Sequence, residues 1–573
     1  MKVLETVRNE TINHPPSTAE AAKQVPLLPV QPPETRAMVT SDGVHLDADI
    51  YRPAVGGPYP VLLMRQAYGR RIACTICYAH PSWYAAHGYV VVVQDIRGRG
   101  SSGGSFNVGE NESADGAETV AWAAKLDGTT GDVGMYGFSY QGYTQLMAAL
   151  AAGRALKALA PAMCPWDARR TWAYENGALR LQGALSWATQ IAAETARHRG
   201  DEQAYADLLR ASHALPLGDP IQARPTYMDR YRHLSHYHRW LDTPEDDPYW
   251  AAISPATHAS QLAARNLPTL LIGGWYDTHL LSCLTAFDDL TRAGASRLRL
   301  AIGPWVHFPW IRRVGAIDFG PGAESKMDEL HIRWFDRWLK GRDTGLLGEA
   351  PIQLFDLGTH EWRDFMTWPR KRLCFALSGS GKASIDPGDG RLDLGGRAAL
   401  GIDYIVHDPW RPAPTVGGAW GNPAGPVDRS SIDARGDVLT FTTAPLDRQI
   451  TLSGNVEANL QVICDAPSFD LCCVLARVTK TGQVFQVVDG YRTVSALPAD
   501  GQVNVPMRAS CVTLHPGEAL RLSISLASFP AYTVNPGTGE SASSTPSAKA
   551  RIITLGVKYG DAAQSTLSVS TED

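Results

Sequence analysis

The sequence predicts an α/β protein whose mostly parallel sheet is followed by a separate all-β region. Between residues 36 and 347, short apolar runs alternate with helix-length segments. Continuous apolar strands of this kind are typical of a parallel sheet that is covered on both faces. After about residue 348 the content of Gly, Pro, Thr and Val rises and the apolar residues alternate, which is typical of a β-sandwich. A chain of 573 residues is also too long for one hydrophobic core.

The expected core sheet begins with two strands on either side of an Asp-Gly turn at 42–43. Buried strands of a parallel sheet are expected at six apolar runs, namely Val61–Met64, Tyr89–Val93, Val133–Tyr136, Leu156–Ala160, Thr269–Ile272 and Leu298–Ile302. A further helix is expected at Glu324–Lys340, because its apolar residues share one face.

The alternation of strands and helices stops between residues 165 and 262. Helical patterns at Trp187–Arg197 and Gln203–Arg210 indicate a helical insertion over the sheet. His233, His236 and His238 lie within it and could in principle bind a metal ion. Because arginines are interleaved with these histidines, we expect a solvated helix face instead.

The overall composition excludes several classes of protein. A net charge of −5 gives no electrostatic reason to expect nucleic acid or a membrane surface as a partner. No stretch approaches the roughly 18 apolar residues of a membrane span, and the first residues lack a signal-peptide core. We therefore expect a cytoplasmic protein. The alternative is an exported protein whose precursor is longer than this sequence. Nine cysteines, two of them at CxxC spacing at 74 and 77, favour buried free thiols over a metal or redox site.

Ser139 is the candidate nucleophile. It stands between a predicted strand at 132–136 and a predicted helix at 140–152, in the stretch Gly137–Gly142. A serine on such a sharp strand-to-helix turn, with small neighbours, is typical of an α/β-hydrolase. The usual motif places its second glycine two residues after the serine, whereas here Gln141 occupies that position and the glycine is Gly142. The alternative is a glycine-rich turn with an incidental serine.

Asp277 and His307 are the candidate acid and base. The partners of the nucleophile in this fold follow it in the order acid, then histidine, each just beyond a strand. Asp277 follows the run 269–272, and His307 follows the run 298–302. Singly, Asp277 could be a helix N-cap and His307 a loop histidine. Because all three roles occur in the expected order, we predict a Ser-His-Asp triad that cleaves an ester or amide through an acyl-enzyme.

Several stretches make the resemblance more specific. They are Gln94–Gly100, Gly137–Gly142 with its displaced glycine, Trp275–Asp277, Gly303–His307, Trp334–Gly341, Glu361–Arg363 and Pro414–Gly418. From about residue 36 to the C-terminus the chain resembles the cocaine-esterase-like branch of serine hydrolases. This branch also contains X-prolyl dipeptidyl peptidases and α-amino-acid ester hydrolases, and the displaced glycine is its own pattern.

The resemblance implies an α/β-hydrolase core with an inserted helical cap and a C-terminal jelly roll. Together with the shifts in composition, it predicts an N-terminal arm at 1–35, the core at 36–164 and 263–347, the cap at 165–262 and the jelly roll at 348–573. The jelly roll offers surface for a homodimer. No cofactor and no metal are expected, because acyl transfer needs only the triad, hydrogen-bond donors and water.

The resemblance also assigns residues to the site. The oxyanion donors would be the backbone N–H of Tyr140 and the hydroxyl of Tyr68, unless Tyr68 merely packs at an edge. Trp172 and Trp187 align with the aromatic wall of the pocket, although tryptophan is also an ordinary core residue. His279 would either donate to a substrate carbonyl or sit in the first turn of a helix.

The expected substrate is a small-molecule carboxylic ester with a bulky or aromatic acyl group. The resemblance would place a carboxylate cluster just after the catalytic acid in an α-amino-acid ester hydrolase, but residues 278–280 are Thr, His and Leu. An X-prolyl dipeptidyl peptidase needs an acidic anchor for a free N-terminus, and it usually carries an added N-terminal domain. An amidase or peptidase that uses the same triad is the alternative.

Overall fold

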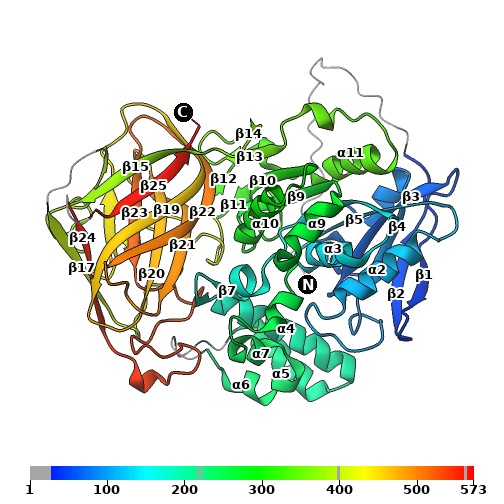
Figure 1. Cartoon of the computed structure of the whole chain (residues 1–573), viewed down its shortest axis with the longest axis horizontal. Coiled ribbons are helices and arrows are strands. Elements are labelled where there is room, and N and C mark those ends of the chain that lie inside the picture. Colours follow the sequence, from blue (N-terminus) through cyan, green and yellow to red (C-terminus); the bar gives the residue numbers. More distant parts are fainter. Residues whose placement is uncertain are drawn as a thin grey trace, which may run out of the picture.

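A ten-stranded mixed sheet forms the centre of the N-terminal part of the protein (Figure 1). The structure is a computed structural model, and it describes residues 27–215, 217, 220, 223–395, 400–560 and 564–572. Most of the predicted N-terminal arm lies outside these residues. The strands, in spatial order, are β1 (Glu34–Val39), β2 (His45–Tyr51), β4 (Val90–Asp95), β3 (Tyr59–Gln66), β5 (Thr129–Phe138), β6 (Leu156–Ala162), β9 (Thr269–Tyr276), β10 (Leu298–Val306), β13 (Ile352–Asp356) and β14 (Glu361–Phe365).

The middle of this sheet is parallel, as the continuous apolar runs predict. β4, β3, β5, β6, β9, β10 and β13 pair in parallel, and all six predicted runs overlap strands of this group. β1 and β2 form the predicted antiparallel pair around the Asp-Gly turn, and β14 closes the other edge antiparallel to β13. Together with the separate all-β region described below, this confirms the predicted fold class.

Helices cover both faces of the sheet, because alternate residues of each strand point to opposite sides. In β3, Val61 and Leu63 belong to one buried cluster with residues of α2 (Glu112–Ala123) and α3 (Tyr140–Ala151). Leu62 and Met64 belong to another, with residues of α1 (Pro81–Ala86) and α11 (Met327–Leu339). α11 lies within the helix predicted at 324–340, and α10 (Leu280–Arg292) joins the first cluster.

A mainly helical segment separates β6 from β9, and most of it lies at the bottom of the view in Figure 1. Its longest helices are α4 (Leu181–Arg199) and α5 (Glu202–His213), which contain the two predicted helical patterns. The segment opens with a π-helical turn, η2 (Ala168–Ala173), and a small hairpin of β7 (Tyr174–Glu175) and β8 (Ala178–Leu179). It continues through α6 (Thr226–Arg230), η3 (Arg232–Leu234), α7 (Tyr237–Asp242), α8 (Pro248–Ala252), η4 (Pro255–His258) and α9 (Ala259–Arg265).

The expectation that His233, His236 and His238 share a solvated helix face is wrong for two of them. His233 is exposed, but His238 is buried and its Nε2 lies 2.6 Å from Asp229 Oδ1. The His236 ring packs against Trp240, with 4.4 Å between ring centroids. The physical reason is that η3 ends at Leu234 and α7 begins at Tyr237, so the three histidines do not lie on one continuous helix.

Among the residues that the structure describes, the C-terminal region forms an eleven-stranded, almost wholly antiparallel sheet, and many of its buried residues belong to the same cluster as one face of the core sheet. A single parallel residue pair, Arg391 with Thr442, links its two halves. Its strands are β15 (Lys371–Ser378), β16 (Arg391–Leu394), β17 (Gly401–His407), β18 (Leu439–Thr442), β19 (Ile450–Cys464), β20 (Phe469–Val478), β21 (Val484–Val494), β22 (Gln502–Leu514), β23 (Ala519–Ser525), β24 (Ile553–Tyr559) and β25 (Thr566–Thr571).

Strand pairing places the change from one sheet to the other after β14, later than residue 348, where the composition changes. β13 joins β10 in parallel, and β14 pairs with β13, so both extend the core sheet. β15, which begins at Lys371, is the first strand of the all-β sheet. The alternating pattern of an edge hairpin is the same as that of a sandwich strand, so the sequence alone does not show to which sheet these strands belong.

Among the residues that the structure describes, no helix combines the length and apolar character that crossing a bilayer requires. No group of three or more His, Cys, Asp or Glu side chains within these residues could hold a metal ion. Cys74 and Cys77 are both free thiols, the first buried and the second half-buried.

Buried neutral histidines predict that the protein loses stability in acid. Burial of His331 lowers its pKa from 6.5 to about 3. Between these values the unfolded chain binds one more proton than the folded chain, so each pH unit of acidification costs about 1.4 kcal/mol of stability. We expect the melting temperature to fall from pH 7 to pH 5, and to fall less in His331→Gln. The exposed His233→Gln is the control, and an equal fall in both variants would contradict the role of His331.

Candidate active site

Ser139 occupies a strained turn between β5 and α3. Its φ of 57° and ψ of −130° are unusual for a residue with a side chain. Its N–H donates to Ala162 O at 2.9 Å, which ties the turn to the end of β6. The turn presents the hydroxyl at the carboxyl end of a central parallel strand, the usual position of ligand sites in open α/β sheets.

The displaced glycine has a packing explanation. A Cβ on Gly142 would lie 2.7 Å from Cys164 Cβ and 3.0 Å from Ala162 O, so α3 can approach the chain at the end of β6 only with glycine there. The Gln141 side chain is buried elsewhere, with its Nε2 within 3.4 Å of both Gln66 Oε1 and Ala73 O. Only the residue that faces β6 has to be small, and in this chain it is the third after Ser139.

His307 and Asp277 lie where the sequence places them. His307 follows β10 directly, and Asp277 follows the neighbouring β9. His307 Nε2 is 3.0 Å from Ser139 Oγ, and His307 Nδ1 is 2.7 Å from Asp277 Oδ1. The three side chains therefore form one continuous line of hydrogen bonds.

Asp277 is held in place by more than the histidine. Its carboxylate is fully buried, and Oδ2 accepts a hydrogen bond of 3.0 Å from the backbone N–H of His279. The N-cap of α10 is His279, so Asp277 does not cap that helix. A buried carboxylate that is hydrogen-bonded through both oxygens can orient the imidazole of His307 and balance its charge.

Tyr68 and Tyr140 flank Ser139. Tyr140 is the first residue of α3, where backbone N–H groups lack intrahelical partners. The hydroxyl of Tyr68 contacts Ser139 and accepts a hydrogen bond of 3.2 Å from Trp187 Nε1. Burial raises the pKa of Tyr68, so its hydroxyl keeps the proton that it could donate to an oxyanion.

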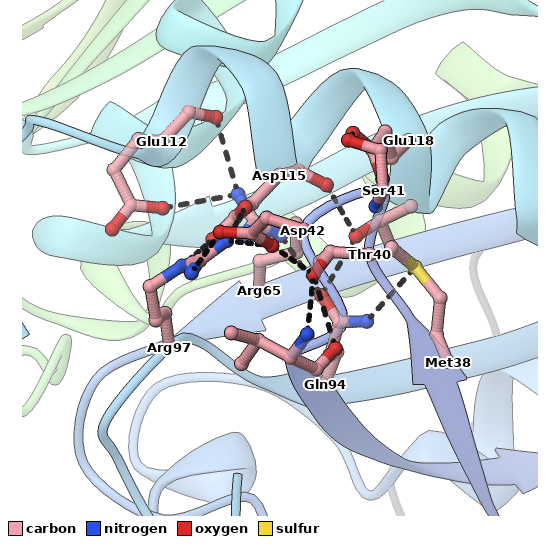
Figure 2. Close-up of polar contacts among 12 residues, drawn as sticks. Met38, Thr40, Ser41, Asp42, Arg65, Gln94, Arg97, Glu112, Asp115 and Glu118 are labelled. Atoms are coloured by element: carbon pink, nitrogen blue, oxygen red, sulfur yellow. Dashed lines mark hydrogen bonds and ion pairs between the residues drawn. The ribbon is translucent and has the colours of Figure 1, made fainter. Parts of the chain in front are cut away.

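A buried polar network supports Tyr140 from behind. The Tyr140 hydroxyl donates to Glu112 Oε1 at 3.2 Å, and Glu112 Oε2 pairs with Arg65 Nη1 at 3.0 Å. Arg65 Nε in turn donates to Gln94 Oε1 at 2.9 Å, within the cluster of polar contacts shown in Figure 2. Because Arg65 lies in β3, three residues before Tyr68, the network connects the segments that carry both tyrosines.

A cavity of about 310 Å³ opens at Ser139. Seven of the eight predicted site residues line it, and the eighth, Asp277, lies behind His307. Trp172 and Trp187 lie side by side in its wall, with 4.9 Å between their ring centroids, and Trp187 stacks on Tyr140. The full lining is Tyr68, Ser139, Tyr140, Pro165, Trp172, Arg180, Gln182, Gly183, Ser186, Trp187, Gln190, Thr278, His279, His307, Phe308, Ala419, Trp420 and Gly421.

His279 lies at the start of a helix, where it is the N-cap of α10, and its buried ring also lines the cavity. Its donation to a substrate carbonyl stays a prediction. Its ring centroid lies 5.5 Å from that of His307. Burial, and then the neighbouring His307 and Arg180, lower the pKa of His279 well below its usual range, so this ring is neutral at physiological pH.

Sequence reasoning missed eleven of the residues that line the cavity, and three of them bear on its chemistry. Phe308 follows His307 directly, and Arg180 is the N-cap that precedes α4. Trp420 comes from a loop of the C-terminal region, more than 100 residues after the triad. The stretch Pro414–Gly418 resembles the family and was a signal near Trp420, but only tertiary packing shows that this loop reaches the cavity.

The fold and the site together define a serine hydrolase with the α/β-hydrolase fold. Residues 42–309 match the model of the X-Pro dipeptidyl-peptidase (S15) family, and residues 345–560 match the C-terminal non-catalytic domain of X-Pro dipeptidyl-peptidases. The cocaine esterase of Rhodococcus sp. strain MB1 Bresler is 31% identical over 87% of this chain and 91% of its own length. The chain belongs to the cocaine-esterase-like family of serine hydrolases.

Solved structures agree with this fold over almost the whole chain. An aminopeptidase from a marine sediment Thaumarchaeota archaeon has a TM-score of 0.78 at 19% identity and covers 98% of each chain. An α-amino acid ester hydrolase has a TM-score of 0.73 at 20% identity, over 97% of this chain and 98% of its own. A CocE/NonD family hydrolase from Staphylococcus aureus has a TM-score of 0.65 at 16% identity, over 94% and 93%.

The tight contact at Gly142 yields a prediction. In Gly142→Ala the added methyl group would push α3 away from Cys164 and shift Ser139 relative to His307. We expect a loss of about 1–3 kcal/mol of stability in urea unfolding, typical of overpacking, together with a lower kcat. The control is Gly153→Ala just beyond α3, where a Cβ would meet no atom within 4 Å. Equal stability and kcat in the two variants would contradict this explanation of the displaced glycine.

Proposed function

We propose that this chain hydrolyses carboxylic esters through an acyl-enzyme on Ser139. One observation carries the proposal, namely the line of hydrogen bonds from Asp277 through His307 to Ser139 Oγ at the mouth of the cavity. A serine hydroxyl becomes a good nucleophile when a positioned base takes its proton. The cocaine esterase of Rhodococcus, to which the chain is similar, is named for such a reaction.

The proposed reaction has two halves. In the first, Ser139 Oγ attacks the ester carbonyl carbon while its proton passes to His307 Nε2, and the imidazolium then protonates the leaving alcohol. In the second, water gives a proton to His307 Nε2 and attacks the acyl carbon, the bond from that carbon to Ser139 Oγ breaks, and His307 returns the proton to Ser139 Oγ as the carboxylic acid leaves. Asp277 holds the tautomer of His307 and stabilises its charged form in both halves.

Tyr68 and Tyr140 would stabilise the oxyanion that forms in each half. The Tyr140 N–H starts a helix, so the helix dipole adds to its hydrogen bond. The Tyr68 hydroxyl accepts from Trp187 and therefore has its own proton available for the oxyanion. Donors of this kind contribute about 10²–10³-fold each to kcat in enzymes of this type.

The walls of the cavity favour a bulky or aromatic acyl group. Trp172, Trp187, Trp420 and Phe308 give flat apolar faces around Ser139. No carboxylate is among the residues that line this cavity in the described part of the chain. A peptide with a free N-terminus, or an α-amino acid ester, would leave its ammonium group unpaired there. The same argument disfavours the peptidase alternative.

The identity of the nucleophile is tested by covalent labelling. A fluorophosphonate should label the wild-type protein, whereas Ser139→Ala should show neither labelling nor hydrolysis of an aryl ester, because the attacking oxygen is gone. Ser186→Ala is the matched control, since Ser186 lines the same cavity outside the triad and should keep both activities. A wild-type protein that is neither labelled nor active would refute the proposed function.

The substrate class is tested with three compounds that share one aromatic acyl group, an ester, its α-ammonium derivative and the corresponding anilide. We expect kcat/KM to be highest for the neutral ester and at least about 10-fold lower for the ammonium derivative, because the cavity offers the charge no partner. Anilide cleavage as fast as ester cleavage would instead support the amidase alternative. Trp172→Ala and Trp187→Ala should each lower the ratio of kcat/KM for an ester with a bulky acyl group to kcat/KM for an ester with a small one.

A further inference from the structure

Arg180 is a buried cation at the junction of three walls of the active-site cavity. It stands between β8 and α4, and only 1% of it is exposed. Neither the triad chemistry nor the oxyanion site needs it. A buried guanidinium is costly to desolvate, so its partners indicate what it does.

Two of its partners are backbone carbonyls on segments that carry site residues. Arg180 Nη2 donates to Thr278 O, and Thr278 stands between Asp277 and His279. Arg180 Nη1 donates to Thr171 O, and Thr171 precedes Trp172 in the cavity wall. One planar group thus joins the loop of the catalytic acid to the aromatic wall.

The third contact reaches the C-terminal region. The Arg180 guanidinium lies over the ring of Trp420, with 4.7 Å between its central carbon and the ring centroid. Trp420 and Arg180 both line the cavity. The cation–π contact therefore connects the C-terminal loop to the same side chain that holds the Asp277 loop.

A charged cluster fixes Arg180 from the opposite side. Arg180 Nε lies 3.9 Å from Glu175 Oε2, on the β7–β8 hairpin. The same oxygen accepts hydrogen bonds of 2.8 Å from Arg508 Nη2 and of 2.8 Å from Tyr532 Oη. Arg508 also pairs with Asp489, so a buried cluster of alternating charges runs from the helical segment into the C-terminal sheet.

We propose that Arg180 is a positioning residue that sets the catalytic-acid loop and links it to the C-terminal domain. The proposal rests on the ester hydrolysis proposed above. Arg180 does not touch the carboxylate of Asp277. It acts through the peptide that follows Asp277, because movement of Thr278 would rotate Asp277 away from His307. A displacement of about 1 Å in such a group can cost about 10²-fold in rate.

The geometry of the side chain decides which substitutions are informative. A guanidinium is a planar fork that can hold two carbonyls at once and stack on a ring. A lysine ammonium keeps the positive charge but lacks the planar set of donors, so Arg180→Lys tests the geometry of the guanidinium separately from its charge. Arg180→Met keeps the length and removes both charge and donors.

Arg299 provides a matched control. It is also buried, and it also donates to backbone carbonyls, those of Leu346, Glu349 and Ala350. Unlike Arg180, it does not line the cavity. Arg299→Met therefore reports what the loss of a buried, carbonyl-binding arginine does to this fold in general.

The test measures four quantities for the wild type and for each variant. They are kcat and KM on an uncharged aryl ester, the rate of fluorophosphonate labelling, and the melting temperature. We expect kcat and the labelling rate to fall together, by at least about 10-fold in Arg180→Met and less in Arg180→Lys, with KM within about 3-fold of wild type. Arg299→Met should lose melting temperature but keep kcat and labelling within about 2-fold.

Two outcomes would overturn the proposal. If Arg180→Met loses melting temperature but keeps kcat and labelling, as Arg299→Met should, the role is structural only. If it raises KM only for an ester that carries a carboxylate, Arg180 binds substrate directly instead. A wild-type protein without esterase activity or labelling would refute the proposed function itself, which is a separate result.

Glu175→Gln keeps the test decisive if the Arg180 variants do not fold. It removes the negative charge beside Arg180 and leaves a side chain of the same shape for Arg508 and Tyr532. We expect kcat and labelling to fall about 3-fold with KM unchanged. Unchanged kcat and labelling would refute the coupling between the C-terminal domain and the acid loop.

Discussion

The parallel pairing of β9 with β10 is the constraint on which the site depends. Because parallel strands end at the same edge of a sheet, Asp277 and His307 come within 2.7 Å of each other although 30 residues separate them. β5 runs parallel to the same strands, two positions from β9 and three from β10, and it places Ser139 at that edge. The helical segment and the C-terminal region then supply the walls around a line of hydrogen bonds that the sheet has already aligned.

Buried polar groups hold this edge from two sides. Behind Tyr140, the pair of Glu112 and Arg65 joins β3 to α2. Beside Asp277, Arg180 joins the acid loop to the helical segment and to Trp420. Such charges are costly to bury and give little net stability, so their value lies in fixing geometry. The site must keep three side chains aligned, and the buried charged groups hold backbone segments that apolar packing alone would allow to shift.

Local patterns were sufficient to predict the apolar strands of the core sheet and several of the longer helices, and they failed where the answer depended on distant partners. The six apolar strands could be predicted because burial on both faces leaves a continuous apolar run in the sequence. β13 and β14 were indistinguishable from sandwich strands until their pairing was known, which is β13 with β10 and β14 with β13. His236 and His238 were misjudged for a similar reason, since a bend between two short helices decides which side of the chain they face.

The sequence by itself determined which three side chains form the line of hydrogen bonds at the site. Ser139, Asp277 and His307 were identifiable because each follows a strand, in the chain order that a parallel sheet converts into proximity. Only the tertiary structure decided the shape of the cavity and what holds it. Trp420 reaches the cavity from a distant loop, and Arg180 acts through carbonyls that have no sequence signature. Backbone acceptors and contacts between domains leave no periodicity in a sequence, so their positions become visible only when the chain is folded.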